Sequence, residues 1–130
     1  MGRARLRYTN ALASWDHDEL MASMAEDVVI RVAVHDQVMQ GRQTADFLFG
    51  VLGEELDQLL ITDEIVDDAK AVVLFDTSLR GQPAQGLNVL HLDAVGLVRD
   101  LTVFFRPLRS LQLVAEVIGG RMAERFGDLG

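Results

Sequence analysis

The most constraining feature of this sequence is a succession of strand-like segments separated only by short turns. These segments are rich in β-branched and aromatic residues, and they span residues 59–66, 71–79, 87–92 and 97–105. The turns between them read Asp67-Asp68, Arg80-Gly81-Gln82-Pro83 and Asp93-Ala94-Val95-Gly96. Connections this short join neighbouring antiparallel strands. The second half of the chain therefore predicts three successive hairpins in one antiparallel sheet.

Helical patterns lie on both sides of these strands. Residues 3–13 predict a first helix, and Asp16 followed by acidic residues predicts a capped second one. A β-branched run at 28–34 predicts a first strand, and residues 45–52 predict a third helix. Pro107 suits the first turn of a final helix, whose apolar stripe would be Leu108, Leu111, Ala115, Ile118 and Met122. We expect Gly119-Gly120 to kink or end that helix.

Helices segregated from consecutive antiparallel strands indicate an α+β fold, in which a curved antiparallel sheet packs on a helical layer. The length suits a single domain over residues 1–130. Both faces of the sheet are partly apolar, since even the less apolar face of 71–79 carries Val72 and Leu74 beside Asp76. A solvated face alternates more cleanly than this. We therefore expect a homodimer that covers the outer face.

Composition excludes several classes of function. The formal net charge of -8 argues against binding of nucleic acid or of an anionic membrane surface. Without cysteine, the chain forms neither a disulfide nor a thiolate metal site. It also lacks a phosphate-binding glycine loop, and we expect no bound cofactor or metal. Because the basic start MGRARLRY lacks the apolar block of a signal peptide, we expect a cytoplasmic protein.

Short motifs follow one another in a characteristic order: Arg7-Tyr8 with Asp16-His17-Asp18, Met24-Ala25-Glu26-Asp27-Val28, Gly41-Arg42, Gly96-Leu97-Val98-Arg99-Asp100-Leu101 and Phe104-Phe105-Arg106-Pro107. Over nearly the whole chain this order resembles the SnoaL-like and ketosteroid-isomerase-like branch of the nuclear-transport-factor-like (cystatin-like cone) superfamily. The resemblance implies a curved sheet wrapped on the N-terminal helices into a cone, with a C-terminal helix. It also implies an internal apolar pocket and a homodimer through the outer sheet face.

The resemblance further implies which residues line that pocket. On the strands these are Ile30, Val32, Val34, Val73, Phe75, Thr77, Leu90, Leu92, Leu101, Val103 and Phe105. Trp15 would either seal one end of the core or line the pocket entrance. In ketosteroid isomerases a phenol and a neutral carboxylic acid polarise the substrate carbonyl, and these two roles fall on Tyr8 and Asn88.

The usual catalytic base has no counterpart in this sequence. By resemblance, the proton-shuttling carboxylate of ketosteroid isomerases falls on Val32, and an aspartate of the limonene-epoxide-hydrolase relatives falls on Val103. Valine accepts no proton. His35 and Asp36, after the first strand, are the remaining candidates, because a histidine titrates near neutral pH. Adjacent strand residues point to opposite faces, so these two need not act together.

Three functions stay open at this point. The first is binding, without turnover, of a largely apolar small molecule that could be polycyclic or contain a carbonyl. The second is an enzyme of the isomerase or polyketide-cyclase type, less so an epoxide hydrolase, in which Tyr8 and Asn88 polarise a carbonyl. The third is a non-catalytic dimeric interaction or structural module with a solid core. An apolar cavity would favour the first two.

Overall fold

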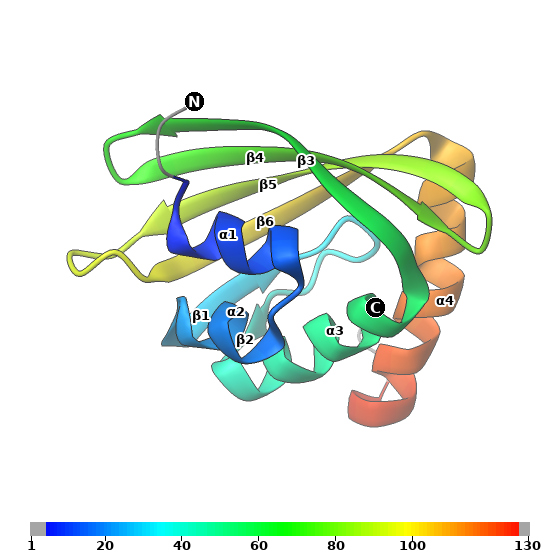
Figure 1. The fold of residues 1–130 in the computed structure, drawn as a ribbon. Coiled ribbons are helices and arrows are strands. Elements are labelled where there is room, and N and C mark those ends of the chain that lie inside the picture. Colours follow the sequence, from blue (N-terminus) through cyan, green and yellow to red (C-terminus); the bar gives the residue numbers. More distant parts are fainter. Residues whose placement is uncertain (1–4, 128–130) are drawn as a thin grey trace.

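A computed structural model describes residues 5–127 of the chain. Its elements follow the predicted order, with one short additional strand (Figure 1). They are α1 (Arg7–Ser14), α2 (His17–Ala22), β1 (Met24–Arg31), β2 (Met39–Gln40), α3 (Arg42–Glu55), β3 (Leu56–Asp67), β4 (Lys70–Leu79), β5 (Gln82–Leu92), β6 (Val98–Arg106) and α4 (Leu108–Phe126). Residues 3 and 4, the predicted start of the first helix, lie outside the described residues.

The strands form one curved sheet in the order β2-β1-β6-β5-β4-β3. The three predicted hairpins between β3 and β6 are antiparallel, as expected. β1 pairs with β6 in parallel, so the sheet is mixed rather than wholly antiparallel. Figure 1 shows β3–β6 arching over α1, α2 and α3, with α4 beside one end of the sheet. The predicted α+β architecture, a curved sheet wrapped on N-terminal helices with a helix at the C-terminus, is confirmed.

Local sequence explains how the N-terminal helices are placed. Trp15 adopts a left-handed conformation with φ 52° and ψ 48°, which ends α1 and redirects the chain. The carboxylate of Asp16 then accepts a hydrogen bond from the backbone N–H of Glu19 and caps α2. Before α3, Gly41 has a φ of 99°, which glycine adopts without strain. These turns set the helices against the concave face of the sheet.

The concave face of the sheet supplies most of the core. One cross-strand row places Val73, Asn88 and Val103 side by side, and the next contains Leu90 and Leu101. All five side chains are buried. In β4, β5 and β6 the face predicted to point inward is therefore the buried one, because side chains alternate strictly along a strand.

β1 differs from its prediction at both ends. It begins at Met24 and ends at Arg31, whereas the β-branched run predicts a strand over 28–34. The chain leaves the sheet at Val32, and residues 32–38 form a loop that returns to β2. Val32 and Val34 are consequently loop residues, although their composition is typical of a strand.

α4 also corrects two expectations. The helix runs through Gly119 and Gly120 without a break. Its inward stripe is Ser110, Val114, Ile118 and Met122, and contacts on both sides of the glycines keep the helix continuous. Leu108, predicted on the inward stripe, is 69% exposed because the helix packs in a different rotation. Within residues 5–127, no helix combines the length and apolar character needed to cross a membrane.

Candidate functional site

A cavity of about 230 Å³ lies between α3, α4, the end of β6 and the loop of residues 32–38. Its wall is almost entirely apolar, and it consists of Val32, Ala33, Val34, His35, Met39, Leu48, Leu52, Val103, Phe105, Val114, Ala115, Ile118, Gly119, Met122 and Ala123. Ala115 and Ala123 are exposed, so the cavity opens to solvent beside α4. A concave apolar wall with few polar groups is typical of small-molecule sites.

The loop that carries His35 is held by the sheet at both of its ends. Ile30 pairs with Met39 across β1 and β2. The backbone N–H of Gly41 donates to the carbonyl oxygen of Val28 over 2.8 Å. Between these anchors the loop brings His35 to the cavity wall, whereas Asp36 is exposed and does not line the cavity. The structure therefore separates the two candidate bases.

His35 contributes the titratable side chain of the cavity wall. The ring is half-buried, and its Nδ1 atom is buried without a hydrogen-bond partner among the described residues. A buried polar atom left unpaired costs about 1–3 kcal/mol. Within residues 5–127, no three His, Asp or Glu side chains gather closely enough to hold a metal ion. The side chains of the cavity wall are therefore apolar apart from the imidazole of His35, whose Nδ1 atom is buried.

Tyr8 on α1 and Asn88 on β5 meet inside the molecule. The side-chain amide of Asn88 donates to the phenol oxygen of Tyr8 over 2.7 Å. The two residues are 1% and 3% exposed, and Asn88 Oδ1 has no partner among the described residues. Burial raises the pKa of Tyr8 above its ordinary value, and the hydrogen bond from Asn88 counteracts part of that rise. The hydrogen bond between Tyr8 and Asn88 therefore joins α1 to the sheet, and the Tyr8 phenol in it is neutral.

The cavity wall does not include Tyr8 or Asn88. Val103, which lies beside Asn88 across β5 and β6, does line the cavity. The structure thus brings the two predicted carbonyl-polarising groups together, but they bond to each other in the packed interior. His35, by contrast, lines the cavity, while its Nδ1 atom is buried and has no hydrogen-bond partner among the described residues.

The remaining sequence-predicted pocket residues divide into two groups. Four of them line the cavity: Val32, Val34, Val103 and Phe105. Six others lie outside the cavity wall. Leu92 is half-buried, and the other five are buried in the core: Ile30, Val73, Thr77, Leu90 and Leu101. The Thr77 hydroxyl donates to the backbone carbonyl of Gln58, which ties β4 to β3. Much of the predicted pocket wall is therefore solid core.

Phe75 and Trp15 also pack away from the cavity. The ring of Phe75 meets that of Phe105 edge-on, with 5.9 Å between the ring centroids. It lies so close to Gly86 that a Cβ there would come within 2.4 Å of the ring. Trp15 packs at the junction of α1, α3 and β3, where its indole lies against Gly53. Both aromatic rings therefore pack against glycines, Trp15 against Gly53 and Phe75 against Gly86, where a larger residue would clash with them.

Sequence reasoning missed the helical half of the cavity wall. α3 contributes Leu48 and Leu52, and α4 contributes Val114, Gly119 and Met122. In the sequence these residues have the ordinary pattern of core-facing helices. The available signal is the small residue every fourth position on α4, at 115, 119 and 123, beside the apolar stripe. Such residues leave space next to a helix.

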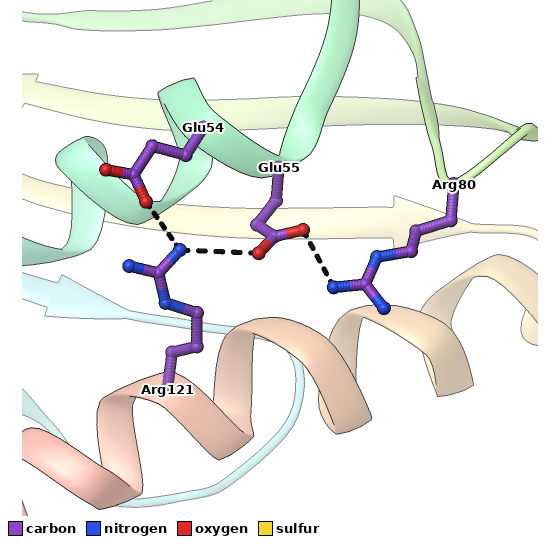
Figure 2. A network of polar contacts seen from close by, with 4 residues as sticks. All are labelled: Glu54, Glu55, Arg80 and Arg121. Atoms are coloured by element: carbon purple, nitrogen blue, oxygen red, sulfur yellow. Dashed lines mark hydrogen bonds and ion pairs between the residues drawn. The ribbon is translucent and has the colours of Figure 1, made fainter.

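A charged network fastens the two helices of the cavity wall at the end of α3 (Figure 2). Arg121 on α4 contacts Glu54 over 2.6 Å and Glu55 over 3.3 Å. Glu55 also pairs with Arg80 in the β4–β5 turn over 3.1 Å. Glu55 is the least exposed member, with a side chain 16% exposed, and it joins both arginines. The network therefore links α3, α4 and the sheet around the cavity.

Neither a family model nor a curated relative matches the sequence. The fold is similar to that of a steroid delta-isomerase from Pseudomonas aeruginosa, with a TM-score of 0.79, 18% identity, and 96% of this chain and 98% of that one covered. A Silicibacter pomeroyi protein with a cystatin-like fold gives a TM-score of 0.82 at 20% identity, covering 88% of this chain and 82% of that one.

A third solved structure extends the same group. An NTF2-like protein of unknown function from Cytophaga hutchinsonii gives a TM-score of 0.64 at 13% identity, covering 85% of this chain and 99% of that one. Identities this low speak to fold rather than to reaction. The layout of sheet and helices, together with these structures, shows that the chain has a cystatin-like α+β fold, in which a curved sheet packs on helices.

Proposed function

We propose that this protein binds a small, largely apolar molecule in the cavity between α3 and α4. The observation that carries the proposal is the cavity itself, about 230 Å³ in volume and lined by aliphatic and aromatic side chains with one histidine. Burying apolar surface there is favourable by roughly 25 cal/mol per Å². The similar fold of a steroid delta-isomerase supports a ligand of low polarity.

Two adjacent glycines on α4 offer a matched test. A Cβ added to either Gly119 or Gly120 meets no atom within 4 Å, but only Gly119 lines the cavity. Leucine at 119 would occupy space that a ligand needs. Leucine at 120 would make the same helix-favouring change outside the cavity. Both variants should be more stable than the wild type by up to about 1 kcal/mol, because each removes a glycine from a helix.

The ligand used in this test is 2-methylnaphthalene, and its binding is followed by its own fluorescence. We expect saturable binding to the wild type and to Gly120→Leu, and binding weaker by about tenfold or more in Gly119→Leu, which corresponds to a loss of about 1.4 kcal/mol. Equal binding to both variants would place the ligand elsewhere. No binding to the folded wild type would favour the non-catalytic interaction module instead.

Acid–base chemistry in the same cavity is the second candidate function. The observation that favours it is the half-buried imidazole of His35 in the cavity wall. Imidazole suits general base work at neutral pH. Asp36 is exposed, and Tyr8 and Asn88 are bonded to each other, so His35 would act as the base. Proton exchange at the acidic carbon of a bound ketone, lost in His35→Gln with binding retained, would support this candidate.

We further propose that two copies associate through the convex face of the sheet. Leu74, Leu87 and Phe104 form one cross-strand row on that face, and Phe104 is 49% exposed. Leu60 and Ile65 on β3 are 65% and 59% exposed. Large apolar side chains exposed on one face of a sheet are typical of an interface. A second copy supplies a matching apolar face by symmetry.

A further inference from the structure

A second pocket lies beside Trp15, near the C-terminal end of α3. It has a volume of about 250 Å³, close to that of the cavity between α3 and α4, and it is bounded by the ends of α1 and α3 and the start of β3. The apolar side chains of Leu12, Leu52, Leu56 and Leu59 line it together with the indole of Trp15. A space of about 150 Å³ holds one benzene ring. This tryptophan pocket therefore has room for at least one further ring.

Leu52 belongs to the walls of both spaces. Within residues 5–127 it is the one residue that the cavity between α3 and α4 shares with the tryptophan pocket. Leu48 lies one helical turn earlier on the same face of α3, and it lines the cavity but not the tryptophan pocket. Both leucines are buried. The side chain of Leu52 is therefore the partition between two spaces of similar size, whereas Leu48 bounds the cavity alone.

The far wall of the tryptophan pocket is fixed more firmly than this partition. Trp15 has a left-handed backbone conformation that ends α1, which directs its side chain toward α3. Its indole lies against Gly53, where a Cβ would come within 2.2 Å of the indole Nε1 atom. The partition, in contrast, is a single aliphatic side chain. The length open to a ligand along this direction is consequently set by the residue at position 52.

From this shared wall we infer that Leu52 is a specificity-determining residue of the cavity, because its side chain closes off the tryptophan pocket and thereby limits the length of the ligand. A smaller residue at this position would let an elongated apolar compound extend from the cavity to Trp15. The inference rests on the proposed function and adds to it a second compartment and the residue that controls access to it. Selection of this kind works by steric exclusion of the longer compound.

The test compares 2-methylnaphthalene with 2-phenylnaphthalene, in which a phenyl ring replaces the methyl group. Affinities of both compounds are measured for the wild type, Leu52→Ala and Leu48→Ala, and the ratio of the long to the short compound is taken in each protein. We expect this ratio to rise about tenfold or more in Leu52→Ala, because burying a further aromatic ring is worth at least that factor. It should stay unchanged in Leu48→Ala, which removes the same atoms from the cavity wall but leaves the partition in place.

The indole N–H of Trp15 gives a direct readout of the second compartment. The sequence contains one tryptophan, so a single indole resonance appears in a ¹⁵N–¹H spectrum. In Leu52→Ala this resonance should shift with 2-phenylnaphthalene and stay in place with 2-methylnaphthalene. Since replacing a buried leucine by alanine destabilises a protein, Leu52→Val and Leu48→Val repeat the comparison with a smaller truncation, and the change in ratio should have the same direction.

The outcomes separate this inference from the proposed function. If the wild type binds 2-methylnaphthalene but the ratio is the same in Leu52→Ala, the role of Leu52 is overturned and the binding cavity stands. An equal rise in Leu48→Ala, or a rise without a shift of the Trp15 resonance, would also overturn it. A Trp15 shift of equal size in the wild type would show that Leu52 does not close the pocket. Failure of 2-methylnaphthalene to bind the folded wild type would overturn the proposed function itself.

Discussion

Tyr8 and Asn88 are 80 positions apart in the sequence, yet they form a buried polar pair. If Tyr8→Phe removes the phenol oxygen, the amide of Asn88 loses its partner inside the core. We expect that substitution to lower the free energy of unfolding by about 1–3 kcal/mol, and Asn88→Leu to act similarly. The double variant removes both polar groups and should cost less than the sum of the single changes. Urea unfolding of the four proteins measures this coupling, and strictly additive losses would contradict it.

The phenol of Tyr8 gives this pair a pH signature. Burial holds its folded-state pKa above the ordinary value of 10.0, while the unfolded chain titrates near that value. Above about pH 10 the unfolded state therefore loses a proton that the folded state keeps, so stability falls as pH rises, by up to about 1.4 kcal/mol per pH unit. Below pH 10 this group contributes no slope. Unfolding measured between pH 9 and 11.5 should show the fall in the wild type and a smaller one in Tyr8→Phe.

Tyr8 is also convenient to observe, because it is the only tyrosine in the sequence. Phenolate absorbance then reports on a single group. In the native protein it should emerge at higher pH than in the urea-unfolded protein. Coincident titrations in the two states would show that the phenol is accessible to solvent, contrary to its exposure of 1%.

At the level of elements, α4 differs from what its sequence predicts, because the helix continues through Gly119 and Gly120. Paired glycines predict a break because each costs about 1 kcal/mol in a helix relative to alanine. Here Ile118 and Met122 are buried on either side of them, and tertiary packing outweighs the local cost. The same packing sets the rotation of the helix, which is why Leu108 faces solvent. Neither effect is visible in propensity alone.

Arg121 joins α4 to the end of α3, and its contribution can be measured. Replacing it with methionine keeps the aliphatic stem and removes both ion pairs. Because the Arg121 side chain is 36% exposed and that of Glu54 is 65% exposed, solvent screening keeps the effect small, and we expect only a slight fall in the free energy of unfolding. The loss should shrink in 1 M salt, where the Debye length is about 3 Å. A loss of the same size at low and high salt would show that the ion pairs are not its cause.

For the whole molecule, the sequence predicted the order of elements, the hairpins and the inward faces of β4, β5 and β6. These follow from local patterns, namely turn residues and alternation of side chains. The parallel pairing of β1 with β6 and the packing of Tyr8 onto Asn88 depend on contacts between distant segments. The cavity was expected along the middle of the sheet, but side chains fill that region. Open space remains where α4 carries small residues, and only the packed structure shows it.

At the scale of the assembly, we predict that the apolar side chains on the convex face of the sheet hold two copies together. Phe104→Glu places a charge in the apolar row on that face and should convert a dimer to a monomer. Val95→Glu, at a position 80% exposed in the β5–β6 turn, is the matched control and should leave the assembly unchanged. Sedimentation velocity at several protein concentrations distinguishes the two species. A monomeric wild type, or a dimer that survives Phe104→Glu, would contradict association through this face.

The measurement that tests the binding cavity most directly is methyl NMR of the wild type titrated with 2-methylnaphthalene. Methyl groups of Val32, Val34, Val103 and Ile118 line the cavity, whereas those of Val72 and Val89 lie on the opposite face of the sheet. We predict saturable shifts for the first four and none for the last two. Shifts confined to Val72 and Val89, or no shift in any of the six, would contradict the assignment of a ligand site between α3 and α4.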